Sequence, residues 1–176
     1  MGRLCRLGVL GFGCFFILAF QSGAGRASTP NSEVVPATQR VKAPNFTVTD
    51  VEGKPLTLAT LKGKVVLLDF WAIACGGCKL ELPWYVGFDQ QYRSKGLSLV
   101  GLDMYGEAPD AVRSFAAAHQ MHYPVAIGTD EIGALYHIGA MPLTVLIDRK
   151  GRVAVSHAGV VDPKLFEADI KTLLAE

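Results

Sequence analysis

Two cysteines separated by two residues, Cys75 and Cys78, are the side chains of this sequence whose type and spacing could do chemistry. They follow the apolar run 65–70, which is typical of a buried strand, and they open a pattern typical of a helix. Unpaired N–H groups and the helix dipole stabilise a thiolate at a helix N-terminus. We therefore predict that Cys75 is the nucleophile of thiol-disulfide exchange and that Cys78, one helical turn further on, is the resolving thiol.

Asp69 is the second residue of chemical interest because it interrupts the apolar strand. A buried carboxylate is costly unless it is paired or neutral, and the sequence offers no evident lysine partner. We therefore expect a raised pKa, which would let Asp69 take or give the proton of Cys78. The alternative is a strand-edge residue that reaches water.

The elements that must position these residues alternate between strand and helix along the chain. Apolar runs predict strands over 65–70, 97–102, 123–127 and 143–147, and helices are predicted over 78–95, 130–136 and from Pro109 and Pro163. Residues 46–58 and 143–156 each indicate a hairpin. In the first helix we expect a core-facing stripe of Leu80, Leu82, Trp84, Tyr85 and Phe88, with a kink at Pro83. This order implies an α/β fold with a sheet that is partly parallel.

The N-terminal residues have the pattern of an export signal. Arg3 and Arg6 precede an apolar run from Leu7 to Phe20, which is short of the roughly 20 residues of a membrane span. We therefore favour a cleaved signal peptide over residues 1–27, with an uncleaved N-terminal anchor as the alternative. A flexible linker over 28–42 and a single domain over 43–176 are predicted to follow.

Composition excludes several classes of function. The 176 residues are 50% hydrophobic and carry a net charge of +1, which gives no indication of nucleic-acid binding. If the signal is removed, Cys5 and Cys14 leave with it, and one close pair of cysteines cannot staple a fold. Zinc would need two further ligands, and the His119-x-x-His122 pair reads as polar surface. We expect no metal and no cofactor.

Several motifs in register carry a resemblance to a known family. They are Asp69-Phe70-Trp71-Ala72, Cys75-x-x-Cys78, Pro83 and Met141-Pro142, and together they resemble the thioredoxin superfamily. The export signal, the Ala43-Pro44-Asn45-Phe46 opening, the Gly63-Lys64 strand entry and the insertion over 109–127 are similar to its TlpA and ResA type. The resemblance covers residues 43 to about 174.

This resemblance implies a thioredoxin-like fold: a central mixed sheet flanked by helices, with an N-terminal hairpin and a helix-strand insertion. It also implies an extracytoplasmic or periplasmic thiol-disulfide oxidoreductase that works without a cofactor and reduces disulfides of exported proteins such as apocytochrome c. The implied partners are a client protein with a disulfide or cysteine pair and a membrane electron donor of thiol type. Contact with the membrane itself would occur only through an uncleaved N-terminal segment.

The resemblance also assigns residues to the site. It implies that Pro142 is cis and lies against the disulfide, whereas from sequence alone it could be a trans proline at a strand start. Substrate contacts are implied at Trp71, Gly76, Gly77, Met141 and Pro142. Glu81 is implied to be a second acid near the thiols, although on its own it would be a solvated helix charge.

Two departures from the family pattern leave other functions open. Ala74 stands where the family usually has Trp, and Gly77 stands where it often has Pro, so thiolate stabilisation and reduction potential should differ. One alternative is a thiol peroxidase of peroxiredoxin type, which shares the Ala-Pro-x-Phe opening but needs a Pro-x-x-x-Thr-x-x-Cys run that is absent here. The other is a redox-inert thioredoxin-like binding module.

Overall fold

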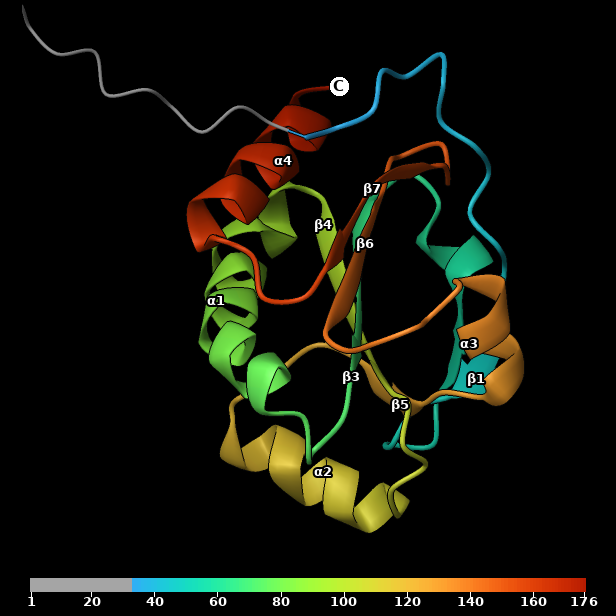
Figure 1. The fold of residues 1–176 in the computed structure, drawn as a ribbon, viewed down its shortest axis with the longest axis vertical. Helices are drawn as coiled ribbons and strands as arrows, with labels where there is room; N and C mark the ends of the chain where they lie inside the picture. The colour runs from blue at the N-terminus through green and yellow to red at the C-terminus, as the bar shows by residue number, and fades with distance from the viewer. Residues whose placement is uncertain (1–32) are drawn as a thin grey trace, which may run out of the picture.

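The computed structural model describes residues 33–176, which form a five-stranded mixed sheet and a separate two-stranded hairpin (Figure 1). The strands are β1 (Thr47–Thr49), β2 (Pro55–Thr57), β3 (Val65–Trp71), β4 (Leu97–Asp103), β5 (Val125–Ile127), β6 (Leu143–Ile147) and β7 (Val153–Ala158). In the large sheet they lie in the order β5-β4-β3-β6-β7. Strand β3 is parallel to β4 and antiparallel to β6, so the predicted mixed sheet is confirmed.

Helices cover both faces of this sheet. They are α1 (Gly76–Tyr92), α2 (Pro109–Ala118), α3 (Asp130–Leu135) and α4 (Pro163–Ala175), with 3₁₀ turns at Leu58–Leu61 and Arg93–Lys95. Helices α1 and α4 lie on one face, and α3 and the β1–β2 hairpin lie on the other (Figure 1). The core is accordingly divided into two buried apolar clusters, one on each side of the sheet.

The central strand β3 leads directly into the site. All seven of its residues are buried, as its apolar run, interrupted only by Asp69, predicted. Leu67 and Trp71 belong to the cluster under α1, so Asp69 faces the same side. Asp69 lies opposite Gly101 on β4 and opposite Thr144 on β6. The only ionisable residue of β3 is therefore placed in the most enclosed part of the sheet, beneath α1.

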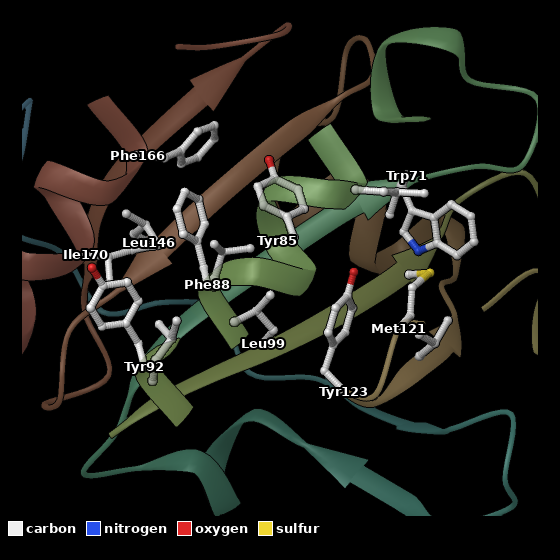
Figure 2. Close-up of a cluster of buried hydrophobic side chains, with 14 of the residues drawn as sticks. Trp71, Tyr85, Phe88, Tyr92, Leu99, Met121, Tyr123, Leu146, Phe166 and Ile170 are labelled. Atoms are coloured by element: carbon white, nitrogen blue, oxygen red, sulfur yellow. The ribbon is translucent and has the colours of Figure 1, made fainter. Parts of the chain in front are cut away.

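Helix α1 begins immediately after Cys75, which is its N-cap residue. The helix runs through Pro83, continues into the 3₁₀ turn and ends at Gly96, whose φ of 103° suits a residue without a side chain. Tyr85 and Phe88 are buried in the aromatic cluster beneath α1, shown in Figure 2. Leu80 is 63% exposed, so its predicted place in the core-facing stripe is wrong.

Residues 33–42 pack against the domain, which differs from the flexible linker that we predicted. Val35 N–H donates to the Ala154 carbonyl at 2.8 Å, and the buried Arg40 guanidinium binds both Asp148 and Glu176. These ties attach the segment to the edge strand β7 and to the end of α4. Low hydrophobicity misled the prediction, because this segment is held by hydrogen bonds and ion pairs and buries little apolar surface.

The predicted signal peptide lies outside the described residues. Within residues 33–176, no helix combines the length and the apolar character that crossing a membrane would require.

Candidate active site

Cys75 and Cys78 form a disulfide at the start of α1. Their Cα atoms are 5.3 Å apart, and the Cys75 sulfur accepts a hydrogen bond from the Cys78 N–H at 3.1 Å. The two cysteines differ in exposure: Cys75 is partly exposed, whereas Cys78 is 2% exposed. A partner molecule can therefore reach Cys75, while Cys78 is reached only from within the chain. The N–H group beside the Cys75 sulfur would also stabilise a thiolate there.

Pro142 lies against the first turn of α1. The Met141–Pro142 peptide bond is cis, as the resemblance implied. A Cβ atom placed on Gly77 would be only 3.1 Å from Pro142 Cδ and 3.1 Å from Val160 Cγ2. The absence of a side chain at Gly77 thus lets the first turn of α1 approach the segments that carry Pro142 and Val160. Gly76, in contrast, faces open space.

Val160 is a site residue that the sequence did not single out. It is 47% exposed and belongs to the loop between β7 and α4, where it borders Gly77 and Pro142. An exposed apolar side chain beside an accessible sulfur is suited to contact a client polypeptide. The sequence signal was weak, because a valine after a glycine is common in loops.

Trp71 is placed differently from its predicted role in substrate contact. It is 0% exposed, and its indole ring stacks on Phe115 of α2 with ring centroids 5.2 Å apart. The structure therefore places this side chain in the buried cluster against which Ile73 and Cys75 pack.

Asp69 is 1% exposed, and neither of its carboxylate oxygens has a hydrogen-bond partner among the described residues. Burial raises the pKa of Asp69 well above its usual value, and the negative charge of Glu81 raises it further. The carboxyl group is therefore held in its neutral form over a wider pH range than an exposed aspartate, and it can act as a proton donor or acceptor inside the protein.

Glu81 is also buried, at 0% exposure, rather than solvated on the helix surface. One carboxylate oxygen, Oε2, accepts a hydrogen bond from the Tyr85 hydroxyl at 3.0 Å, and Oε1 accepts one from the Val161 N–H at 3.2 Å. Burial raises the pKa of Glu81, although these two donors and the charge of His157 oppose the shift. Two buried acids with raised pKa values therefore lie near each other, Asp69 on β3 and Glu81 on α1.

Tyr85 and Thr144 complete this polar cluster, and the sequence analysis assigned neither to the site. The Tyr85 hydroxyl lies 2.7 Å from Thr144 Oγ1, and burial together with the charges of Asp69 and Glu81 raises the pKa of Tyr85 well above its usual value. The hydroxyl thus stays protonated and available to donate to Glu81. Tyr85 has a place in the helical stripe, but sequence periodicity cannot show what its hydroxyl meets.

Comparison with known proteins gives consistent results. Residues 40–156 match the model of the AhpC/TSA family. The chain is 42% identical over 114 residues to a thiol-disulfide oxidoreductase ResA of Bacillus cereus, which covers 64% of this chain and 65% of that protein. It is 37% identical over 134 residues to a thiol-disulfide oxidoreductase ResA of Bacillus thuringiensis, which covers 75% of this chain and 76% of that protein.

A solved structure resembles the same region. The crystal structure of a thiol:disulfide interchange protein of the thioredoxin family from Chlorobium tepidum has a TM-score of 0.71 and 28% identity, and the match covers 77% of this chain and 97% of that chain. The fold of the present chain is thus shared with proteins that are named for thiol-disulfide exchange.

Proposed function

The chain belongs to the AhpC/TSA family and is a thiol-disulfide oxidoreductase similar to the ResA proteins, and we propose that it reduces disulfides of exported proteins outside the cytoplasm. One observation carries this proposal: a partly exposed Cys75 sulfur at a helix N-terminus, bonded to a buried Cys78 beside two buried acids. This arrangement gives the two thiols different roles.

In the reduced chain, the Cys75 thiolate attacks one sulfur of a client disulfide. A mixed disulfide forms between Cys75 and the client, and the second client sulfur leaves as a thiolate that takes a proton. The Cys78 thiolate then attacks the Cys75 sulfur, releases the first client sulfur and closes the Cys75–Cys78 disulfide. The client gains two electrons and two protons, and the chain loses the same number.

The buried acids serve the proton steps of this proposal. Cys78 is covered and must lose its proton before it can attack, and Asp69 and Glu81 lie on the strand before it and one helical turn after it. An acid whose pKa is raised by burial can accept that proton and return it when the disulfide is reduced again. Tyr85 holds Glu81 in place through its hydroxyl.

The client class and the location are inferences from sequence. The apolar N-terminal run preceded by Arg3 and Arg6 supports export, and the likeness to the TlpA and ResA type supports a reductive role toward a client such as apocytochrome c. A thiol-type electron donor at the membrane would then supply the two electrons that return the disulfide to the dithiol.

The direct test uses the reduced full-length chain and a peptide that contains an oxidised Cys-x-x-Cys-His segment, the attachment sequence for c-type haem. We expect release of two peptide thiols per chain that becomes oxidised. The Cys78→Ala variant should stop at a mixed disulfide with the peptide, and Cys75→Ala should form none. A mixed disulfide trapped by Cys75→Ala but not by Cys78→Ala would reverse the assigned roles.

The reduction potential of the Cys75–Cys78 pair separates the remaining possibilities. A strongly reducing value supports a disulfide reductant, whereas a value near that of glutathione or above would indicate an oxidase or isomerase. Rapid consumption of peroxide by the reduced chain would favour a thiol peroxidase. A disulfide that no physiological donor reduces would favour a redox-inert binding module.

A further inference from the structure

Asp103 is a buried carboxyl group at the end of β4, outside the cluster of Asp69 and Glu81. It is 0% exposed. Its Oδ1 atom accepts hydrogen bonds from the N–H groups of Gly106 at 3.0 Å and Glu107 at 3.2 Å, which closes the turn after β4. Its Oδ2 atom meets no donor among the described residues, and the carboxyl group of Glu107 lies beside it. Burial and the neighbouring Glu107 carboxyl group both favour the protonated form of Asp103, so this carboxyl group can share its proton with Glu107.

Glu107 connects this pair to the loop that carries the nucleophile. Its Oε2 atom accepts a hydrogen bond from the Ile73 N–H at 3.2 Å, two residues before Cys75. Next to this contact, the Met104 N–H donates to the Trp71 carbonyl at 2.9 Å, and the Cys75 N–H donates to the Ala72 carbonyl at 3.1 Å. The turn after β4 is therefore joined to the end of β3 by one backbone hydrogen bond and to the loop over 72–74 by the Glu107 carboxyl group.

We propose that Asp103 and Glu107 are positioning residues that share one proton and thereby hold the loop in front of Cys75 in the conformation that presents its sulfur. Neither group touches the reacting sulfur atoms, so both act through the Ile73 N–H. The inference rests on the proposed function, because it concerns the position of Cys75 as the attacking group.

The Asp103 carboxyl group of this pair gains and loses its proton near neutral pH. Burial, followed by the adjacent Glu107 carboxyl group, raises the pKa of Asp103 to about 7. Below that pH the pair carries a single negative charge, and the Asp103 carboxyl can donate to Glu107. Above it both groups are ionised and repel each other, and Glu107, which is partly exposed, can turn toward water and release Ile73.

Charged groups on the surrounding elements are engaged elsewhere. The register partners of Asp103 are Trp71 on β3 and Ile127 on β5, which do not titrate in this range. From α1, the Lys79 ammonium lies over the Phe115 ring, 5.9 Å from its centroid. From α2, Asp110 pairs with Arg113, and its side chain is 91% exposed. Glu107 is thus the ionisable neighbour that adds to the effect of burial on the pKa of Asp103.

The test follows two readouts on the full-length chain across this pH range. In ¹⁵N-labelled protein, the amide resonance of Ile73 should shift with a midpoint near the Asp103 pKa of about 7. Over the same range, the rate of Cys75 with the oxidised peptide, divided by its thiolate fraction, should fall by about threefold or more, because a displaced reacting group attacks more slowly.

Three variants decide the outcome. Asp103→Asn should abolish both transitions, because an amide can donate to Glu107 at every pH, and Glu107→Gln should move the transition to lower pH, because the neighbouring negative charge is gone. The exposed Asp110→Asn is the matched control and should change neither readout. An Ile73 resonance that titrates unchanged in Asp103→Asn overturns the proposal, as does a per-thiolate rate that stays constant while Ile73 titrates.

The two readouts also separate this inference from the proposed function. A chain in which Cys75 reacts with the peptide but Ile73 does not titrate contradicts the inference alone. A chain in which Cys75 is inert toward the peptide contradicts the proposed function, and with it the positioning role, even if Ile73 still reports a shared proton.

Discussion

The Tyr85 hydroxyl and the Thr144 hydroxyl lie 2.7 Å apart in the core, on a helix and a strand that are 59 residues apart in sequence. Tyr85 also donates to Glu81, so one phenol oxygen links α1, β6 and a buried acid. Tyr123 is a useful contrast, because its hydroxyl is equally buried but has no partner among the described residues. Figure 2 shows both rings in the same cluster.

The first prediction compares these two tyrosines. Tyr85→Phe should lower the free energy of unfolding by about 1–3 kcal/mol, because Glu81 loses a buried donor and Thr144 a buried partner. Tyr123→Phe should be neutral or stabilising by up to about 1 kcal/mol, because it removes a buried hydroxyl without a partner. Urea unfolding of both variants measures the difference, and equal losses would contradict the assigned bonds.

The second prediction concerns the pH dependence that Asp69 gives to stability. Its pKa is raised in the folded state, so above the usual value of 3.8 the unfolded chain ionises while the folded chain stays protonated. Stability therefore falls as pH rises toward the folded-state pKa, by at most about 1.4 kcal/mol per pH unit from this group.

Asp69→Asn should remove this contribution and flatten the slope, and chemical unfolding at a series of pH values measures it. Asp110→Asn provides the exposed control and should leave the slope as in the unmodified chain. A slope as steep in Asp69→Asn as in the unmodified chain would mean that the pKa of Asp69 is not raised by folding.

The third prediction compares the two glycines of the redox turn. An alanine at Gly77 would bring its Cβ to 3.1 Å from both Pro142 and Val160, whereas at Gly76 it would meet nothing within 4 Å. Gly77→Ala should displace the segments that carry Pro142 and Val160 and slow the reaction with the oxidised peptide by up to about tenfold. Gly76→Ala should keep the rate and slightly stabilise the fold. Stopped-flow kinetics measures the rates of both variants. Equal rates would contradict the prediction, because they would show that Pro142 and Val160 can move aside without affecting the reaction.

The fourth prediction concerns Arg40, whose side chain is 2% exposed between Asp148 and Glu176. Arg40→Met should lower the free energy of unfolding by about 3 kcal/mol, because two carboxylates lose a buried partner. Burial opposes ionisation of Asp148, but Arg152, Arg40 and backbone donors outweigh it and lower its pKa. Its stabilising contribution is therefore present above the usual value of 3.8 and is lost as pH falls through the lower folded-state value.

Acid unfolding of Arg40→Met should consequently show a smaller loss of stability on acidification. Lys171→Met is the control, because the Lys171–Glu167 pair is exposed to solvent and contributes little to stability. An Arg40 variant no less stable than this control would mean that the ion pairs do not fasten residues 33–42.

The order of strands and helices could be predicted because buried elements show recognisable patterns of apolar residues in the sequence. The apolar run at 65–70 became β3 and that at 143–147 became β6, since strands covered on both faces need apolar residues at every position. Leu80 shows the limit of this reasoning. It is apolar like a core residue, but its side chain is exposed, because the buried face of α1 carries Cys78, Glu81, Leu82 and Tyr85.

The polar interior was much less predictable. Glu81 looks like a surface charge in its own helix, and it is buried by Val161, a loop residue 80 positions away. The same holds for Glu107, whose contact with Ile73 depends on how β4 pairs with β3. Asp69 could be singled out because its strand is uniformly apolar, whereas these acids are enclosed by segments distant in sequence.

The position of Arg40 also indicates where the domain could be attached to a solid support. It joins residues 33–42 to Glu176 and to Asp148, which follows β6. Because Val66 at the start of β3 pairs with Ile147, this junction lies at the end of the sheet away from Cys75, which follows the other end of β3. A sensor surface, an affinity bead or a fluorescent label coupled near this junction would therefore leave the sulfur unobstructed, and a domain immobilised there could pass electrons to soluble partners while attached.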